Sequence, residues 1–543
     1  MRLSLPQWKM SSTKLILLVS LYFTVALNIA FFRKVLELQP FGGTSMDYFL
    51  YTLPLVYFCA INIILTVLSL PFVHKVIVPL LIVISAAISY NSLFFNVYFD
   101  VDMLTNVLET DAAESFRLLT VPYLCWVFFL GIVPAVLYCL VKIEYKTWWK
   151  ELLYRVGAIL VFALAILGVA RFFYQDYASF FRNNKSLHYL ITPSNFVESA
   201  IKKVRHYYRD NTPYMEQGLD AKLSKSDSKR NVTVIVLGET TRAQNWGLNG
   251  YARQTTPKLA ARGDEIINFK DVNSCGTATA TSVPCIFSTL TRSEFKGTKA
   301  AKQDNLLDML QRAGVEILWL NNNSSCKGVC QNTPNINVML LDLPEFCRND
   351  VCLDNALLGE LDKALEKPSD KDLLVVLHTM GSHGPTYFER YTDKEKVFTP
   401  TCDTNEINRC SNEQLSNTYD NTIVYADQLI DQVITRMEKH PEWKSAVAYL
   451  ADHGESLGED GIYLHGTPYA IAPEYQTKVP MVFWFSPTWK ENKPYDMTCL
   501  RNNAASKTYS HDNFFHSMVA VSDLDLGLSV YNKDLDILSE CKK

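Results

Sequence analysis

The sequence has little net charge, −4 over 543 residues at neutral pH, and this argues against a nucleic-acid partner, which would call for a strongly basic surface. It contains no internal repeat and no paired CxxC arrangement, the spacing that commonly holds a structural zinc ion. Its length exceeds that of one ordinary domain. Hydrophobic residues make up 48% of the chain, and they are concentrated in its first third.

Five long apolar segments lie in that first third. They are approximately residues 14–32, 48–73, 76–95, 119–141 and 152–174. Each is long enough to cross a hydrocarbon core, which needs roughly 20 residues. We do not expect the first to be a cleaved signal peptide, because four more follow it and no small-residue cleavage site is evident. The pattern predicts a transmembrane domain over residues 1–174 with five helices and a lipid-facing outer loop at 96–118.

Basic residues orient these segments. If each segment crosses the membrane, three regions lie on the same side of it: the N-terminus, the turn between the second and third segments, and the loop between the fourth and fifth segments. The basic residues of these regions are Arg2, Lys9, Lys14, Lys75, Lys142, Lys146 and Lys150. Since cytoplasmic loops are enriched in Lys and Arg, this face is predicted to be cytoplasmic, although Arg33 and Lys34 lie in the first outer loop. The chain beyond about residue 174 is then expected outside the membrane.

Cysteine placement supports the same orientation. Cys59, Cys125 and Cys139 lie in apolar segments, where a thiol behaves as a small apolar residue, and the other ten cysteines lie beyond residue 270. An even number confined to the exported part predicts disulfides in an oxidising compartment. The sequence does not prove their connectivity. The spacing suggests the pairs Cys275–Cys285, Cys326–Cys330, Cys347–Cys352, Cys402–Cys410 and Cys499–Cys541.

Residues 175–230 are predicted to connect two domains. The stretch "YQDYASFFRNNK" is aromatic and basic, which is typical of a segment that lies on a membrane surface. The polar stretch that follows, "YRDNTPYMEQGLDAKLSKSDSKRN", lacks hydrophobic periodicity and predicts a linker.

From Asn231 the pattern alternates between short apolar runs and helix-length stretches. The runs "VTVIVLG", "EILWL", "DLLVVLH", "AVAYLA" and "VPMVFWF" are typical of strands buried on both faces. Stretches such as 305–313 and 417–439 have the length of helices. This alternation predicts a doubly wound α/β domain over residues 231–543, in which a site forms at the carboxyl ends of the strands.

Carboxylates and imidazoles follow three of these predicted strands. Glu239 follows the first, His383 follows the third, and Asp452 and His453 follow the fourth, with His465 a little further on. Zinc accepts mixed sets of nitrogen and oxygen ligands, so these residues predict a metal centre. Taken alone, Glu239 could simply cap a helix.

The stretch "DVNSCGTATATSVPCIFS", residues 271–288, places several hydroxyl groups between two cysteines and leads into "IFSTL", where we expect a helix to begin. A helix N-terminus favours anions, and a nearby zinc ion would lower the pKa of a hydroxyl and make it a nucleophile. A solvated or capping loop is the alternative. The hydroxyls that spacing alone does not distinguish are Thr277, Thr279, Thr281 and Ser282.

Together these stretches resemble the lipid A phosphoethanolamine transferases, membrane enzymes associated with polymyxin resistance. The motifs are "VLGETTRAQNWGLNGYAR", "SCGTATATSVPCIFS", "GSHGPTYFERY", "TPTCDTNEINRC", "NTYDNTIVYAD" and "LADHGESLGEDGIYLHGTPYAIAP". The resemblance covers nearly the whole chain. It implies a five-helix transmembrane domain and an α/β domain of the alkaline phosphatase and sulfatase superfamily. The expected location is the inner membrane of a Gram-negative bacterium, with the catalytic domain in the periplasm, and we expect a monomer.

The resemblance also implies roles for particular residues. The expected zinc ligands are Glu239, Thr279, Asp452 and His453. Thr279, the second threonine of the family's CGTxT pattern, is also the expected nucleophile. Contacts to the phosphate and the head group are expected from Ser324, Lys327, His383 and His465. One zinc ion is expected to bind tightly, and a second could bind near the two histidines of that set.

Three residues of the loop 96–118 match family positions that receive the ethanolamine head group. They are Asn106, Thr110 and Glu114, whose spacing of four places them on one face of a helix. A carboxylate there would complement the ammonium group, and the amide and hydroxyl would supply hydrogen bonds. From spacing alone, an ordinary solvated helix face is the alternative.

The implied reaction transfers phosphoethanolamine from phosphatidylethanolamine to a phosphate of lipid A. Thr279 would carry the group as a covalent ester after diacylglycerol leaves. The product would hold an added cation, which weakens the attraction of cationic antimicrobial peptides to the membrane surface. The alternatives are transfer to the lipopolysaccharide core or another glycan, a membrane-bound hydrolase, and a lipid-binding membrane sensor without enzymatic activity.

Overall fold

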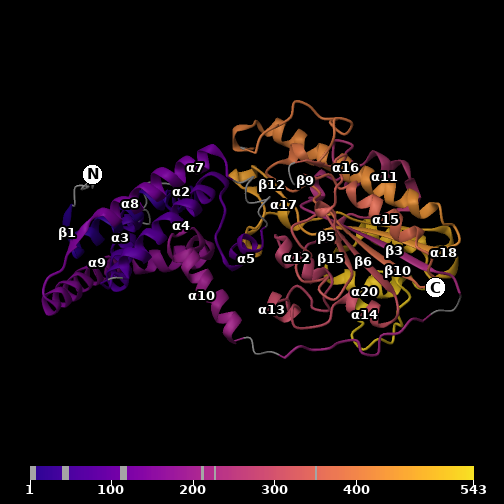
Figure 1. Ribbon diagram of the computed structural model, residues 1–543, viewed down its shortest axis with the longest axis horizontal. Coiled ribbons are helices and arrows are strands. Elements are labelled where there is room, and N and C mark those ends of the chain that lie inside the picture. Colours follow the sequence, from indigo (N-terminus) through magenta and orange to yellow (C-terminus); the bar gives the residue numbers. More distant parts are fainter. Residues whose placement is uncertain are drawn as a thin grey trace. The chain divides into compact units, whose positions relative to one another are not determined.

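The computed structural model describes residues 8–39, 48–71, 73–110, 119–209, 213–224, 228–348, 351–405 and 407–543. The chain divides into two compact units. The first comprises Met1–Leu104 and Leu119–Lys203, and the second comprises Thr105–Leu118 and Val204–Lys543. Figure 1 shows that the first unit is built from helices and the second around a sheet.

Helices that are long and apolar enough to cross a membrane form the first unit. Among the described residues they are α3 (Tyr48–Leu68), α4 (His74–Phe95), the run from α7 to α8 (Val121–Leu140) and α9 (Trp148–Asn183). A bent pair of shorter helices at the start of the chain makes a fifth if it counts as one span. No residue of the apolar window in α9 is buried inside the protein, as expected of a helix that faces lipid. By length and composition, the described part of the chain therefore holds four or five candidate spans.

The first predicted span, 14–32, is not one straight helix. Ser12–Leu27 (α1 and a π-helical turn) and Ile29–Leu38 (α2) are bent by 53° at Asn28. The buried Asn28 amide donates to the carbonyl oxygen of Thr192 at 3.0 Å, and the Thr192 N–H donates back to Asn28 Oδ1 at 2.9 Å. A polar side chain that takes partners outside its helix interrupts the helical ladder, and this explains the bend.

The connector predicted at 175–230 contains more helix than the sequence suggests. Helix α9 continues to Asn183, and α10 spans Ser194–Arg209. Val197, Ile201 and Val204 recur at the three- and four-residue intervals of an amphipathic helix. This periodicity is the signal from which α10 follows.

A seven-stranded sheet forms the core of the second unit, in the order β4-β14-β11-β3-β10-β6-β7. Its strands are β3 (Asn231–Gly238), β4 (Ile266–Phe269), β6 (Glu316–Asn321), β7 (Asn335–Asn337), β10 (Leu373–His378), β11 (Lys444–Ala451) and β14 (Met481–Phe485). β11, β3, β10, β6 and β7 are parallel, whereas β14 runs antiparallel to β11. Every residue of β3, β10 and β11 is buried, in keeping with their continuous apolar runs.

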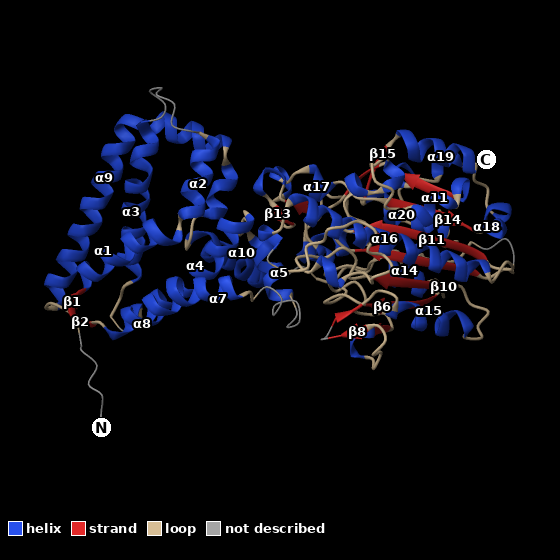
Figure 2. Ribbon diagram, turned by 90° about the horizontal axis from the view of Figure 1, so that it is seen from above, coloured by secondary structure: helices blue, strands red, loops and turns tan. Residues whose placement is uncertain are grey.

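Helices cover both sides of this sheet (Figures 1 and 2). In Figure 1, α16 (Asn412–Glu438) lies above the strands, whereas α14 (Leu306–Arg312) and α20 (Asp512–Val521) lie below them. α16 begins with a capping box, in which Ser411 Oγ accepts from the Gln414 N–H at 3.2 Å and the Gln414 side chain accepts from the Ser411 N–H at 3.0 Å. The predicted α/β architecture is confirmed.

The ten cysteines beyond residue 270 form five disulfides in the second unit. Their partners are the ones that the spacing suggests. The bonds are Cys275–Cys285, Cys326–Cys330, Cys347–Cys352, Cys402–Cys410 and Cys499–Cys541. Cys59, Cys125 and Cys139, in the apolar helices, are free thiols.

Candidate metal and nucleophile site

The carboxyl ends of four neighbouring parallel strands deliver polar side chains to one edge of the sheet. Asp452 and His453 follow β11, and Glu239 follows the adjacent strand β3. The segments 379–383 and 322–327 follow β10 and β6, the next two strands in order. The strand order therefore gathers at one edge residues that are far apart in sequence.

Glu239, Asp452 and His453 form a buried cluster, called here the Glu–Asp–His cluster. One ligand atom from each residue lies within 4.8 Å of the others, and all three side chains are buried. His453 Nε2 is 3.3 Å from Glu239 Oε1 and 3.4 Å from Asp452 Oδ2. A mixed set of imidazole nitrogen and carboxylate oxygens is suited to zinc.

The hydrogen bonds around the cluster leave two atoms, His453 Nε2 and Asp452 Oδ2, available as metal ligands. His453 Nδ1 donates to the Gly454 carbonyl at 2.9 Å, so the Nε2 atom that faces the carboxylates is the unprotonated one when the ring is neutral. Asp452 Oδ1 accepts from the amides of Thr240 and His453 at 3.0 and 2.7 Å. Among the residues that the structure describes, none makes a hydrogen bond to the buried Asp452 Oδ2. A buried carboxylate oxygen without a donor is costly, so these residues fit a bound metal ion.

Thr279 is the hydroxyl that faces this cluster. Its Oγ1 lies 3.1 and 3.2 Å from the two carboxylate oxygens of Glu239 and 3.4 Å from His453 Nε2. It is the first residue of α12, which spans Thr279–Ile286. The helix dipole favours negative charge at that position.

The prediction that this helix begins at "IFSTL" is wrong, because α12 ends at Ile286, where that stretch begins. Ala278 has an extended backbone and its carbonyl accepts from the N–H groups of Thr281 and Ser282 at 3.0 and 2.9 Å. β-Branched residues have low helix propensity, and the helix also contains Pro284, so the sequence favours a loop here.

Burial and mutual charge shift the pKa values of the cluster. Burial, followed by the charge of Glu239, raises the pKa of Asp452 to about 7. Burial lowers the pKa of His453, but the two carboxylates outweigh it and raise this pKa to about 10. Burial likewise opposes ionisation of Glu239, yet its hydrogen bond to His453 and the charge of that ring hold its pKa well below the usual range. Two carboxylates exceed what one imidazolium can balance, so a bound cation would stabilise the cluster.

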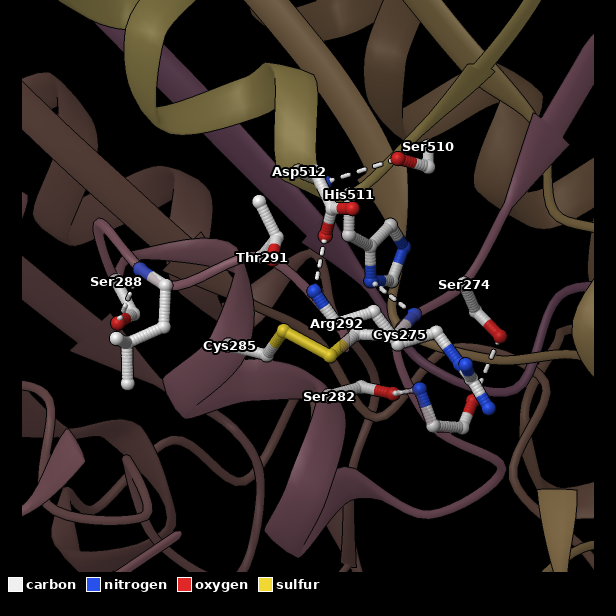
Figure 3. The surroundings of a disulfide bond; sticks show 12 residues. Ser274, Cys275, Ser282, Cys285, Ser288, Thr291, Arg292, Ser510, His511 and Asp512 are labelled. Atoms are coloured by element: carbon white, nitrogen blue, oxygen red, sulfur yellow. Dashed lines mark hydrogen bonds between the residues drawn. A yellow bond between two sulfur atoms is a disulfide. The ribbon is translucent and has the colours of Figure 1, made fainter. Parts of the chain in front are cut away.

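The loop that carries Thr279 is held at several points (Figure 3). The Cys275–Cys285 disulfide joins the loop to α12, and Ser282 Oγ accepts from the Gly276 N–H at 3.1 Å. Thr277 Oγ1 donates to the Thr467 carbonyl at 2.7 Å. Neighbouring hydroxyls therefore bond to the backbone, whereas the Thr279 hydroxyl bonds to Glu239.

The predicted phosphate contacts lie at the same sheet edge. Lys327 Nζ donates to Ser324 Oγ at 3.0 Å, and the lysine side chain is only 6% exposed. The His465 ring centroid is 4.4 Å from that of His453 and 5.3 Å from that of His383. The structure thus brings both histidines beside the Glu–Asp–His cluster.

Two residues outside the predicted ligand and contact residues also position this site. Asn323 Nδ2 donates to Glu239 Oε2 at 2.9 Å and to the Thr379 carbonyl at 3.0 Å. Glu455 accepts from His465 Nδ1 at 2.9 Å and from the Tyr387 hydroxyl at 2.6 Å. Asn323 follows a predicted strand and directly precedes Ser324, and this position could have identified it from the sequence.

Helix α5 (Val101–Glu109) carries part of the predicted head-group set. Thr110, which follows it, donates through Oγ1 to the Asn106 carbonyl at 2.7 Å. Residues 105–118 belong to the second unit, in which Glu109 lies 3.8 Å from Lys327 Nζ. Glu114 lies outside the described residues.

The fold and the site together define a class of protein, a membrane-anchored enzyme with a sulfatase-type α/β domain. A model of the Sulfatase family matches residues 231–524, and a model described as "Phosphoethanolamine transferase EptA/EptB" matches residues 57–208.

Individual relatives agree with both matches. The chain is 41% identical to "Phosphoethanolamine transferase EptA" of Escherichia coli (strain K12), over 97% of this chain and 96% of the relative. It is 38% identical to "Phosphatidylethanolamine transferase Mcr-1" of Escherichia coli, over 86% and 88% of the two chains. A solved structure, the "Integral membrane protein lipooligosaccharide phosphoethanolamine transferase A (EptA)" of Neisseria meningitidis, superposes with a TM-score of 0.97 at 53% identity, over 99% and 100% of the chains.

The chain therefore belongs to the EptA/EptB family of phosphoethanolamine transferases. It is a phosphoethanolamine transferase enzyme, integral to the inner membrane, with its catalytic domain in the periplasm. The predicted resemblance and location are confirmed.

Proposed function

We propose that the enzyme transfers phosphoethanolamine from phosphatidylethanolamine to a phosphate of lipid A, through a covalent ester on Thr279. The observation that carries this proposal is the Thr279 hydroxyl at the start of α12, 3.1 Å from Glu239 in a buried cluster suited to a cation. The disulfide between Cys275 and Cys285 restrains the loop, and a restrained nucleophile loses little orientational freedom on reaction.

In the first half-reaction, Thr279 Oγ attacks the phosphorus of phosphatidylethanolamine, and the hydroxyl proton passes to solvent. The bond between phosphorus and the diacylglycerol oxygen breaks, and that oxygen takes a proton from His383, from His465 or from water. Diacylglycerol leaves, and phosphoethanolamine stays on Thr279. When bound to the Glu–Asp–His cluster and Thr279, a zinc ion would lower the pKa of the hydroxyl and offset phosphoryl charge.

In the second half-reaction, an oxygen of a lipid A phosphate attacks the same phosphorus. The bond to Thr279 Oγ breaks, and the hydroxyl regains a proton. Lys327 and Ser324, which bond to each other at 3.0 Å, hold the phosphoryl oxygens in both halves. The product gains an ammonium group, which masks the lipid phosphate and lowers the affinity of the membrane for cationic antimicrobial peptides.

Donor recognition is assigned to Asn106, Thr110 and Glu114. The first two lie one helical turn apart, and Glu109, also in this segment, approaches Lys327 to 3.8 Å. A donor whose phosphate bonds to Lys327 would place its ammonium group within reach of this segment. A pocket at membrane level suits the donor, because a lipid leaves the bilayer only at a large free-energy cost.

Several further expectations belong to the same proposal. We propose five spans, with the bent pair at Asn28 as the first, and a monomeric enzyme. The domains are 1–174, with the lipid-facing loop 96–118, the connector 175–230 and the catalytic domain 231–543. One zinc ion binds tightly, and a second binds near His383 and His465.

Mass spectrometry of lipid A from cells that express the enzyme tests this proposal. Lipid A should gain phosphoethanolamine with wild type and not with Thr279→Ala. Phosphoethanolamine found on the core sugars or another glycan would contradict the lipid A acceptor. Unchanged lipids together with a zinc-free protein would favour the lipid-binding sensor.

A further inference from the structure

His511 lies beside Cys275 of the loop that carries Thr279 (Figure 3). The ring is 1% exposed and immediately precedes α20. The Cys275 N–H donates to His511 Nδ1 at 3.0 Å, and His511 Nε2–H donates to the Ala451 carbonyl at 3.0 Å. Only the neutral ring protonated at Nε2 makes both bonds.

Each of these two hydrogen bonds joins His511 to a segment that carries residues of the site. Cys275 is bonded through its disulfide to α12, whose first residue is Thr279. Ala451 is the last residue of β11 and directly precedes Asp452. The imidazole therefore bridges the nucleophile loop and the strand that carries two residues of the Glu–Asp–His cluster.

Neighbouring residues hold the same junction. The His511 N–H donates to the Asn273 carbonyl at 3.0 Å, just before the nucleophile loop. Asp512 Oδ1 accepts from the Arg292 N–H at 2.7 Å, beyond the end of α12. The Arg292 guanidinium lies 3.4 Å from the centroid of the Tyr469 ring. The segment that contains His511 thus contacts the chain on both sides of the nucleophile helix.

We propose that His511 is a positioning residue for phosphoryl transfer, setting the separation between the Thr279 loop and the Asp452–His453 segment by bridging Cys275 and Ala451. The inference rests on the roles proposed above for Thr279 and the Glu–Asp–His cluster. Burial lowers the pKa of His511 to about 3, so the ring stays neutral and Nδ1 remains an acceptor near neutral pH. Loss of an outer partner of a metal site typically costs 10- to 100-fold in metal affinity or activity.

His516, in the helix α20 that follows His511, provides a matched control. It is also buried, and its Nδ1 accepts from the Asn532 N–H at 3.1 Å, far from the nucleophile loop in sequence. Wild type, His511→Ala and His516→Ala would be compared as full-length, zinc-loaded proteins in detergent. The readouts are kcat and KM with a fluorescent phosphatidylethanolamine, zinc retention against a chelator, and Tm.

We expect His511→Ala to lower kcat about 10- to 100-fold, to leave KM little changed and to speed zinc loss. His516→Ala should lower Tm and leave kcat and zinc retention at wild-type values. His511→Asn keeps an acceptor for Cys275, and His511→Gln keeps a donor for Ala451, so each should restore part of the lost kcat.

Wild-type kcat and zinc retention in a folded His511→Ala variant would overturn the inference. If His511→Ala does not accumulate, the test uses His511→Asn and His511→Gln instead. A wild-type kcat in both of these variants would likewise overturn the inference. Thr279→Ala, measured alongside, separates the two claims. An active Thr279→Ala variant contradicts the proposed function, whereas inactive Thr279→Ala with normal His511 variants contradicts only the positioning role.

Discussion

Buried carboxylates lie at both ends of strands β3 and β11, but their partners differ between the two ends. At the amino ends, Asp523 Oδ2 accepts from Lys444 Nζ at 2.7 Å and from Asn231 Nδ2 at 3.0 Å, and its other oxygen accepts from Lys493 Nζ. At the carboxyl ends, Asp452 lies beside another carboxylate, and no described residue makes a hydrogen bond to its Oδ2 atom.

Asp523 contributes to the stability of the fold, whereas Asp452 is suited to bind a cation. Burial raises the pKa of Asp523, but the charge of Lys493 and the hydrogen bonds from Asn231 and both lysines outweigh it and hold this pKa below its usual value. The ionised form of Asp523 therefore favours the folded state. Burial and Glu239 raise the pKa of Asp452 to about 7, so its ionised form is disfavoured until a cation binds. A buried carboxylate whose charge is only partly balanced by its neighbours is available to a cation.

The largest expected effect is at the catalytic end. Thr279→Ala should lower transfer roughly 10⁴-fold or more, because the nucleophile is removed and no other group replaces it. The fold should persist, since alanine is a better helix former than threonine at a helical position. Zinc should still bind to the Glu–Asp–His cluster, more weakly with one ligand removed. Turnover of phosphatidylethanolamine, zinc content and Tm check these outcomes, and a folded variant with wild-type turnover would refute the nucleophile assignment.

Paired substitutions at Asp452 and Asp523 test the comparison directly. Asp523→Asn removes the buried carboxylate that both Lys444 and Lys493 contact and should destabilise the protein by about 3–5 kcal/mol, with zinc retention unchanged. Asp452→Asn should lose zinc and activity, whereas the Tm of the metal-free protein should be unchanged or higher. Denaturant unfolding, calorimetry and zinc analysis provide the measurements. A large loss of metal-free stability in Asp452→Asn would break the comparison.

The stability gained from Asp523 should depend on pH. Its folded-state pKa is depressed, so the contribution is fully present above the unfolded-state pKa and is lost as the pH falls through the folded-state value. Wild type should therefore lose more stability than Asp523→Asn on acidification. Unfolding curves of both proteins across the acidic range check this, and identical slopes would contradict it.

The disulfide at the catalytic end should have an intermediate effect. Replacing Cys275 and Cys285 by serine should lower stability by about 2–4 kcal/mol, because a closed loop is released in the unfolded chain. The loss should appear as a lower Tm or poor accumulation. Two free thiols at these positions in the native protein would refute the bond.

The smallest expected effect lies in the predicted head-group set. Glu114→Gln should weaken binding of phosphatidylethanolamine by roughly 1.5–3 kcal/mol, since a charge-assisted contact to the ammonium group is lost. Zinc content should not change. A phosphodiester that lacks the amine should react equally well with both proteins, and equal losses on both substrates would show that Glu114 does not recognise the ammonium group.

Sequence patterns predicted the parts of the site in which local chemistry and topology agree. Continuous apolar runs identified β3, β10 and β11, and Glu239, Asp452 and His453 follow strands directly. The rule for the carboxyl ends of parallel strands then places these residues together.

Other parts depend on partners distant in sequence. The bend at Asn28 is set by Thr192, 164 residues away, and His511 meets Cys275 after a separation of 236 residues. Neither contact can be predicted from a local sequence motif. The start of α12 was misplaced because threonines and a proline favour a loop by propensity, and the surrounding contacts override that preference.

Trapping the covalent intermediate tests the central claim most directly. Zinc-loaded enzyme would be mixed with phosphatidylethanolamine in the absence of an acceptor, quenched and digested, and its peptides analysed by mass spectrometry. The account predicts one added phosphoethanolamine group on Thr279, formed together with diacylglycerol and removed when lipid A is added. Turnover without this adduct, or an adduct on another residue that lipid A discharges, would contradict it.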